Sequence, residues 1–224
     1  MLSVILGMGT ALWPAAPRAE EPQEASRSPA AFEGLVTGHV KTFMEVFGER
    51  PALMDTSETT RAWMAPGGQR VERGDPGKPT LLALQRRAGV PAPYACTVIQ
   101  QMCLPIHDGS PGFGLANWKV ERKGRATVAG VTCDLVAMEA PSARLELCVT
   151  RELGPGGIWL QQWVPRGSVA SVERALAQAG LGDFPLRVKL WQGRPQHEVE
   201  VTSVARKPVQ ASSFDLPEGC KLLP

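Results

Sequence analysis

The side chains best suited to chemistry lie in one short loop and in five scattered cysteines. The loop reads "HDGSPG" and places His107, Asp108 and Ser110, the three residue types of a hydrolytic triad, close together in the chain. A working triad needs its members to converge from separate elements, and the G-x-S-x-G elbow of many hydrolases is absent. Gly, Pro, Asp and Ser favour tight turns. The sequence therefore predicts a turn here and no catalytic residue.

Cys133 and Cys148 lie at mirror positions around a Pro-Ser pair. With a two-residue turn at Ala140-Pro141, Cys133 lies opposite Cys148 across a hairpin, within reach of a disulfide. That bond would close a loop of about 15 residues and contribute roughly 3 kcal/mol in the chain-entropy model. An alternative register matches the apolar residues of the two strands and turns Cys148 to the opposite face. Both registers are open from the sequence.

Cys96 and Cys103 are seven residues apart, which puts them on opposite faces of a straight strand and two turns apart on a helix. They can form a disulfide only if the segment between them bends. The alternative is a zinc site with His107, but the sequence has no compact finger spacing and no C-x-x-C pair, so we expect no metal. Cys220 is left over, either as a free buried thiol or paired with Cys96 or Cys103.

Four tryptophans are candidates for lining a ligand site. Trp159 and Trp163 lie in "IWLQQWVP", which reads as a strand with both rings on one face and other apolar residues on the opposite face. A strand that is apolar on both faces is either covered on both sides or lines a cavity. Trp118 and Trp191 are expected to join the same face. Core packing and a ligand-lining role are both open for these four residues.

The chain contains 23 Gly and 20 Pro in 224 residues, which indicates frequent reversals and favours short strands over long helices. One helix is predicted between Ser168 and Gly180, because the apolar residues recur at helical spacing between an N-cap residue and a C′ glycine. The segment from Tyr94 to Leu104 is predicted as either a strand or a short helix. Strands are predicted over 32–47, 61–66, 69–74, 78–84, 117–124, 126–139, 143–153, 158–165, 184–191 and 197–206.

The first residues indicate export. An apolar run, "MLSVILGMGTALW", has the length of a signal peptide and precedes a small, polar, Pro-rich stretch. We predict a signal segment over 1–19, a disordered linker over 20–31 and one domain over 32–224, in a periplasmic or extracellular location. A buried or disordered N-terminus in the cytosol is the alternative. No apolar run reaches the roughly 18 residues of a membrane helix, so none is expected in the mature chain.

The net charge of +2, with 21% charged residues, is ordinary for a globular protein and predicts no nucleic-acid partner. Basic clusters at 86–87 and 122–125 are expected to be solvated strand ends, with weak contact to anionic lipid or polysaccharide as the alternative. The glycines of "GFGLAN" do not complete the dinucleotide fingerprint, and we expect no cofactor.

Four motifs stand out in the second half of the chain: "TVAGVTC" (127–133), "LCVTRELG" (147–154), "FPLRV" (184–188) and "FDLPEGCK" (214–221). They resemble a bacterial family of exported proteins of unknown function, the domain of unknown function 4412 type, whose relatives share a pattern with LolA-like lipoprotein carriers. The family ending usually has Tyr where this chain has Cys220. The resemblance implies an α+β fold, mainly β, in which a strongly curved antiparallel sheet, a half-barrel, carries one main helix on its concave side.

The resemblance also implies that the concave side accepts an acyl chain or another apolar group. The first hypothesis is therefore an exported, non-enzymatic envelope domain that binds a lipid or a lipoprotein acyl chain. A structural or interaction module with a filled core is the second hypothesis, and a hydrolase with an unrecognised site is the third. A void lined by Trp159 or Trp163 favours a carrier, whereas a solid interior favours the interaction module.

Overall fold

The strands pair into a single sheet in the computed structural model, which describes residues 32–46, 52–75, 78–86, 94–97, 100–106, 117–164, 167–216 and 218–222. Within these residues the sheet has twelve strands in the order β12-β6-β5-β4-β3-β2-β1-β11-β10-β9-β8-β7. Their bounds are β1 (Gly34–Val46), β2 (Ala52–Ala65), β3 (Gly68–Asp75), β4 (Lys78–Arg86), β5 (Tyr94–Thr97), β6 (Met102–Pro105), β7 (Lys119–Val128), β8 (Val131–Ala140), β9 (Ala143–Thr150), β10 (Phe184–Trp191), β11 (Pro195–Arg206) and β12 (Lys221–Leu222).

Strand pairing follows chain order in two runs. Strands β1 to β6 each pair with the next, as do β7 to β11, which agrees with the tendency of consecutive strands to be neighbours in a sheet. Strand β11 then pairs with β1, so the two runs form one sheet. Every pair is antiparallel except β12 with β6, which confirms the predicted antiparallel sheet. The ambiguous segment Tyr94–Leu104 bends into the β5–β6 hairpin.

Two α-helices occur among the described residues, α1 (Gly157–Gln161) and α2 (Val169–Gln178), with a 3₁₀ turn, η1 (Ala211–Phe214), near the C-terminus. The predicted helix is confirmed as α2, whose apolar stripe is buried. The helix ends as expected at Gly180, which has φ of 66° and supplies the left-handed residue that a helix C-terminus commonly needs.

The prediction of a strand over 158–165 is wrong. The first part of this segment is α1, preceded by Gly156 at the N-cap position. Trp159 and Trp163 are four residues apart and so share one face of a helical turn, as they would have shared one face of a strand. The β-branched and aromatic residues of "IWLQQWVP" favour a strand. In the structure, however, the three consecutive residues Ile158, Trp159 and Leu160 are all buried, which is typical of a helix that is covered on most sides.

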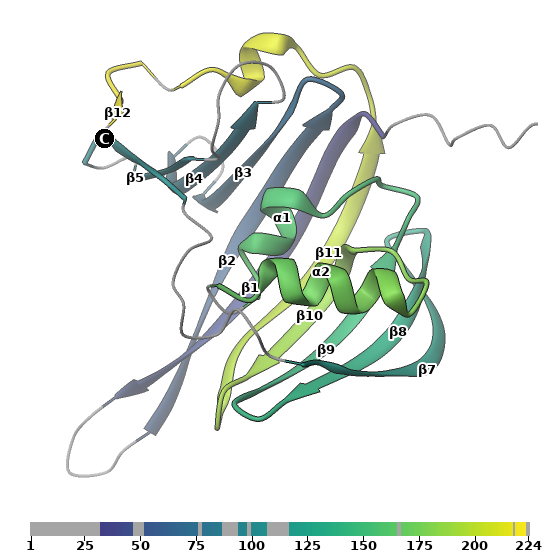
Figure 1. Ribbon diagram of the computed structural model, residues 1–224. Coiled ribbons are helices and arrows are strands. Elements are labelled where there is room, and N and C mark those ends of the chain that lie inside the picture. Colours follow the sequence, from purple (N-terminus) through teal and green to yellow (C-terminus); the bar gives the residue numbers. More distant parts are fainter. Residues whose placement is uncertain are drawn as a thin grey trace, which may run out of the picture. The chain divides into compact units, whose positions relative to one another are not determined.

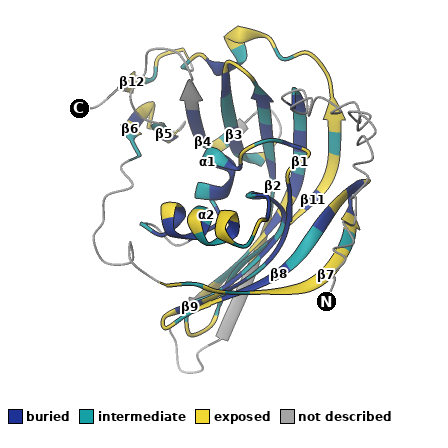
Figure 2. Cartoon of the chain, turned by 45° about the vertical axis from the view of Figure 1, so that its right-hand side comes forward, coloured by how far each residue is buried: buried dark blue, intermediate teal, exposed yellow. Residues whose placement is uncertain are grey.

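Both helices lie against the concave side of the sheet, as Figures 1 and 2 show. The side of α2 that meets the sheet is buried, and its other side is exposed (Figure 2). Between the helices and the sheet lies the main core, and its largest fully buried side chains include Trp159, Trp163, Phe184, Met138 and Leu145. The predicted architecture of a mainly β, α+β fold with a main helix on the concave side is confirmed.

A second, smaller cluster lies on the opposite face of the sheet. Successive residues of a strand point to opposite faces, and on β4 Ala83 belongs to the main core while Leu82 and Leu84 belong to the second cluster. The C-terminal segment covers this face: Phe214 is buried, and Arg70 of β3 donates a hydrogen bond to the Ser213 carbonyl at 3.0 Å. The "FDLPEGCK" motif therefore serves to seal the back of β3 to β6.

Candidate functional site

The two tryptophans predicted to line a ligand site lie in the interior under α1. The ring centroids of Trp159 and Trp163 are 5.3 Å apart in an edge-to-face arrangement, and Trp159 stacks on Phe184 at 5.9 Å. Only 0% and 1% of the Trp159 and Trp163 surfaces are exposed. Among the described residues, both rings are therefore enclosed by protein atoms, as core side chains are.

Polar contacts from distant strands hold α1 in place above this cluster. The Gln69 side chain on β3 donates a hydrogen bond to the Pro155 carbonyl at 3.0 Å and accepts one from the Ile158 N–H at 3.1 Å. The Trp159 indole N–H donates to the Pro185 carbonyl on β10 at 2.8 Å. Because the first backbone N–H groups of a helix lack partners within the helix, Gln69 satisfies a group that burial would otherwise make costly.

The far end of the α1 segment meets a charged pair and a histidine. His197 Nε2 lies 2.8 Å from the Trp163 carbonyl, and because a carbonyl only accepts, the Nε2 nitrogen carries the proton. Arg73 pairs with Glu58 and lies over the Trp163 ring at 5.4 Å from its centroid. Burial lowers the pKa of His197, the hydrogen bond to Trp163 raises it, and the Arg73 charge lowers it further, with a net decrease. His197 is thus neutral at ordinary pH, and its hydrogen bond holds the Trp163 carbonyl to β11.

The indole N–H of Trp163 has no hydrogen-bond acceptor among the described residues, although it is buried. A buried donor without a partner costs roughly 1–3 kcal/mol. The Arg73 guanidinium over the ring and the His197 ring at 6.0 Å compensate in part through contacts with the π-system. The cluster is therefore packed as a core is, and the Trp163 indole nitrogen is its one buried polar side-chain atom without a hydrogen-bond partner among the described residues.

Of the other two predicted ligand-lining tryptophans, Trp118 packs at the edge of the core that contains Trp159 and Trp163, and Trp191 does not. Trp118 precedes β7 and is half-buried, and its indole N–H donates to the Ser171 hydroxyl of α2 at 3.1 Å. Trp191 ends β10 on the opposite face of the sheet, where the Arg144 guanidinium lies 5.5 Å from its ring centroid. Strand alternation gives the reason: Leu190 points into the core, so its neighbour Trp191 must point away from it.

Four of the five cysteines form the two disulfides that the sequence suggested, Cys96–Cys103 and Cys133–Cys148, and Cys220 is free. Because the sulfurs of Cys96 and Cys103 are bonded to each other, they are not available as zinc ligands. Groups of three or more residues suited to hold a metal are absent from the described part of the chain.

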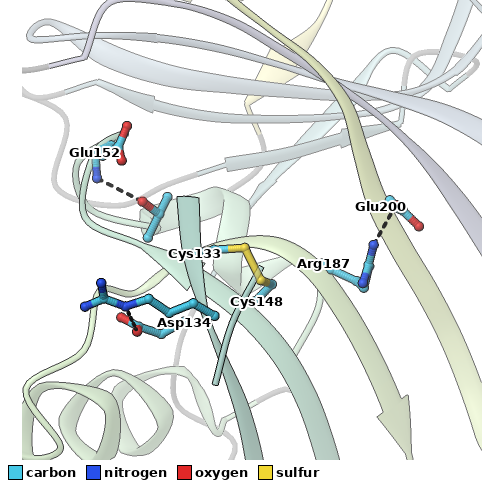
Figure 3. Close-up of a disulfide and its surroundings, with 8 residues drawn as sticks. Cys133, Asp134, Cys148, Glu152, Arg187 and Glu200 are labelled. Carbon is cyan, nitrogen blue, oxygen red and sulfur yellow. Dashed lines mark hydrogen bonds and ion pairs between the residues drawn. A yellow bond between two sulfur atoms is a disulfide. The ribbon is translucent and has the colours of Figure 1, made fainter. Parts of the chain in front are cut away.

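The register of the Cys133–Cys148 hairpin differs from both expectations. The turn residues are Pro141 and Ser142, so Cys148 pairs with Leu135 and lies diagonal to Cys133, with 5.3 Å between their Cα atoms. Diagonal residues two positions apart still share a face, and that face also carries the Arg187–Glu200 ion pair (Figure 3). The register that matched the apolar faces is wrong because Leu147 and Leu145 of β9 pair with Val136 and Met138 of β8, whereas Leu135 pairs with Cys148.

The loop containing His107, Asp108 and Ser110 lies outside the described residues. The basic cluster at 122–125 lies on the edge strand β7 and is mostly paired. Arg122 donates to the Ala179 and Gly180 carbonyls at the end of α2, Lys123 pairs with Glu121 at 2.5 Å, and Arg125 with Asp134 at 3.4 Å. Charged side chains on an exposed edge strand hinder its pairing with other chains. This position agrees with the prediction that the cluster at 122–125 is a solvated strand end.

One open concavity among the described residues is a groove of about 660 Å³ beside α2. One wall is a stripe of α2 at helical spacing, and the other consists of the chain just after β9 and just before β10. The lining residues are Arg151, Gly154, Pro155, Ala170, Glu173, Arg174, Ala177, Leu181, Gly182 and Asp183. Below, this is called the α2 groove.

Two glycines allow the walls of the α2 groove to approach so closely. A Cβ on Gly182 would lie 2.3 Å from the Thr150 carbonyl oxygen, and a Cβ on Gly156 would lie 2.3 Å from the Asp183 carbonyl oxygen. No side chain fits at either position, so the segments after β9 and before β10 run backbone against backbone. Arg151 adds a long hydrogen bond, 3.5 Å, to the Leu181 carbonyl.

The α2 groove is not evident from the sequence, although the sequence contains signals for it. Ala170, Glu173, Arg174 and Ala177 recur at positions i, i+3, i+4 and i+7, which defines a second face of the helix. The "LCVTRELG" motif supplies part of the opposite wall. Nothing in a sequence without alignment says that these two stretches meet.

Comparison with known proteins gives one match to a family model. Residues 113–220 match the family model described as a domain of unknown function, DUF4412. Curated protein sequences give no match. Among the described residues, neither helix has the length and apolar character needed to cross a membrane.

Three solved structures illustrate the structural likeness. The Pseudomonas aeruginosa MucA/MucB complex matches with 12% identity and a TM-score of 0.44, over 84% of this chain and 58% of that one. A DUF1329 family protein from Desulfovibrio piger gives 8% and 0.36, over 86% and 93% of the two chains. A putative outer membrane lipoprotein-sorting protein domain from Vibrio parahaemolyticus gives 7% and 0.34, over 85% and 92%.

The chain spans 57–59% of the length of the MucB structures it matches. The family match covers residues 113–220, which include the "TVAGVTC", "LCVTRELG" and "FPLRV" motifs, the α2 helix and all but the last residue of "FDLPEGCK". Residues 113–220 thus match the DUF4412 model, in agreement with the resemblance that the motifs of this part of the chain predicted.

Proposed function

We propose that this protein is an exported, non-enzymatic domain of the bacterial envelope that binds an extended segment of a protein partner in the α2 groove. Export is supported by the two disulfides, because such bonds persist mainly in oxidising compartments outside the cytosol. It is also supported by the signal-like sequence over 1–19. The observation that carries the proposed binding mode is the contrast between a filled interior and an open, charged groove.

The chemistry of the α2 groove favours a polypeptide over an acyl chain. Arg151, Arg174, Glu173 and Asp183 place both signs of charge along it, beside the small side chains of α2. An acyl chain would remove water from these charged groups and return no hydrogen bond, which is costly. An extended peptide carries backbone donors and acceptors as well as side chains of either charge, so it can replace the lost water.

A lipid carrier would need a different arrangement of the interior. An acyl chain placed between α1 and the sheet must displace Trp159 or Trp163, and with them the contacts to Gln69, Pro185 and His197. Moving two fully buried tryptophans out of the core would cost several kcal/mol. Lipid binding is therefore the alternative outcome of the experiment below.

Site-specific photo-crosslinking from α2 tests the proposal. A photoreactive residue replaces Ala177, which is exposed and lines the groove, and in a control it replaces Gln178, which is exposed on the same helix outside the groove. The full chain is expressed with its N-terminal segment, irradiated in the exported fraction, and its adducts are identified by mass spectrometry. We expect a discrete protein adduct from position 177 and none from position 178.

Charge reversal supplies the matched control. Arg174→Glu inverts an exposed groove charge, whereas Lys119→Glu inverts an exposed charge on the edge strand β7. A synthetic peptide with the crosslinked sequence should bind the purified chain roughly tenfold more weakly after Arg174→Glu, and unchanged after Lys119→Glu. Equal adducts at both positions, a lipid adduct at 177, or equal peptide affinity in both variants would each reject the α2 groove as the binding surface.

A further inference from the structure

Three cysteines lie near one another at the end of the sheet that is formed by β5, β6 and β12. Cys96 on β5 pairs directly with Cys103 on β6, and the next strand in the sheet is β12, which follows Cys220. Cys96 and Cys103 are fully buried in the second cluster, and the half-buried Cys220 packs against that cluster. A free thiol therefore lies within the same small group of side chains as a disulfide.

The strand register brings Cys220 to the face that carries Cys103. Lys221 pairs with Met102 and Leu222 with Cys103, so Cys220 lies two positions from the residue opposite Cys103. Residues two positions apart share a face. Cys133 and Cys148 are also offset by two positions, on the antiparallel pair β8–β9, and they are bonded in this structure. An offset of two positions between neighbouring strands is therefore compatible with a disulfide in this sheet.

The order of the three strands also sets the direction of approach. Because β6 lies between β5 and β12, Cys220 reaches Cys103 from the side opposite to Cys96. Thiol–disulfide exchange proceeds by attack of a thiolate on one sulfur while the other sulfur leaves. The leaving sulfur departs most easily when it lies opposite the attacking one, and the strand order β5-β6-β12 places the backbones of Cys96 and Cys220 on opposite sides of Cys103.

We propose that Cys220, Cys103 and Cys96 form a thiol–disulfide exchange site within the chain. The Cys220 thiol loses its proton, and its thiolate attacks the Cys103 sulfur. A Cys103–Cys220 bond forms, the Cys96–Cys103 bond breaks, and Cys96 leaves as a thiolate that takes up a proton. The number of disulfides and thiols is unchanged, so the step needs no external oxidant or reductant.

Exchange changes what holds the C-terminal segment to the back of the sheet. Before exchange, the segment is held by non-covalent contacts such as the Arg70 to Ser213 bond and the bond from the Lys221 N–H to the Gln101 carbonyl at 2.9 Å. After exchange it is covalently attached to β6 through Cys220. The released Cys96 thiol is buried beside Leu82 and Leu84, where a thiol behaves as a small apolar group.

Differential alkylation of the full chain tests the proposal. The protein is incubated at mildly alkaline pH without added thiol, free thiols are alkylated after unfolding, and tryptic peptides are mapped by mass spectrometry. We expect two populations, one with alkylated Cys220 and one with alkylated Cys96 and a Cys103–Cys220 cross-link. The Cys133–Cys148 bond should be intact in both and reports that the chain is folded.

Three single substitutions separate the proposal from adventitious scrambling. Cys96→Ser should form the Cys103–Cys220 bond in nearly all molecules, and Cys220→Ser should show no alkylation of Cys96. Cys103→Ser should leave Cys96 and Cys220 as two free thiols, because β6 separates them. Absence of the Cys103–Cys220 cross-link in Cys96→Ser with Cys133–Cys148 intact, or a Cys96–Cys220 bond in Cys103→Ser, would overturn it.

Discussion

The two tryptophans under α1 differ in one respect that a matched pair of substitutions can measure. In Trp159→Phe, the smaller ring leaves a cavity that costs about 1 kcal/mol. The change also removes the hydrogen bond to the buried Pro185 carbonyl, and an unsatisfied buried acceptor costs about 1–3 kcal/mol more. The free energy of unfolding should therefore fall by about 2–4 kcal/mol.

Trp163→Phe leaves a cavity of similar size and weakens the contact with Arg73, which is worth about 0.5–1 kcal/mol. It also removes an indole N–H that has no acceptor among the described residues, which returns about 1–3 kcal/mol. The net change should lie within about 1 kcal/mol of zero. Two identical substitutions in one cluster should therefore differ clearly.

Urea unfolding of the oxidised protein, followed by far-ultraviolet circular dichroism, measures both variants without relying on tryptophan emission. Thermal unfolding gives a second reading, since 1 kcal/mol corresponds to a shift in Tm of about 2–4 °C in a domain of this size. If Trp163→Phe destabilises the protein as much as Trp159→Phe, the hydrogen-bond assignments of the cluster are wrong.

Three further changes probe the groove, the His197 hydrogen bond and the disulfide by the same urea assay. Burial lowers the pKa of His197 in the folded protein, so the stability that the neutral ring contributes is present above about pH 6.5 and is lost as pH falls toward the folded pKa. His197→Gln should therefore flatten the dependence of the unfolding free energy on pH. An unchanged slope would contradict the role of His197. Gly182→Ala puts a Cβ 2.3 Å from a carbonyl oxygen of β9 and should lower the free energy of unfolding by more than about 2 kcal/mol. The control Gly67→Ala, whose Cβ meets nothing within 4 Å, should lower it by less than about 0.5 kcal/mol. Similar losses in the two variants would refute the close approach of the backbones at Gly182. Replacing both Cys133 and Cys148 by Ala opens a disulfide with a sequence separation of 15 and should cost about 3 kcal/mol, whereas no loss would show that the bond adds nothing.

The fold could be predicted where the sequence carries a period. The α2 stripe between Ser168 and Gly180 and the alternating strands predicted over 184–191 and 197–206 gave correct elements, because burial of one face imposes a 3.6- or 2-residue repeat. The single strand predicted over 126–139 is wrong, since the chain turns between β7 and β8 at Ala129 and Gly130. The α1 segment failed because a helix of five residues, covered on most sides, shows no polar face. The four-residue spacing of Trp159 and Trp163 fits both the 2-residue repeat of a strand and the 3.6-residue repeat of a helix.

Contacts between distant segments could not be predicted in the same way. Gln69 lies 89 residues from Ile158 in the chain, and the α2 groove needs two glycines whose role depends on which backbone lies beside them. The parallel pairing of β12 rests on two residues only, too few for any periodicity. The β8–β9 register was missed because the apolar residues on the outer face of β8 imitate a core face.

The central claim is that the space between the helices and the sheet is filled, so that this protein binds its partner at the surface. Titration of the oxidised chain with a brominated fatty acid tests this directly, because bromine quenches indole emission only at short range. We expect the emission of the buried tryptophans to be unchanged at saturating lipid. Saturable quenching of the buried, short-wavelength emission that disappears in Trp159→Phe would contradict the claim and support an acyl-chain carrier.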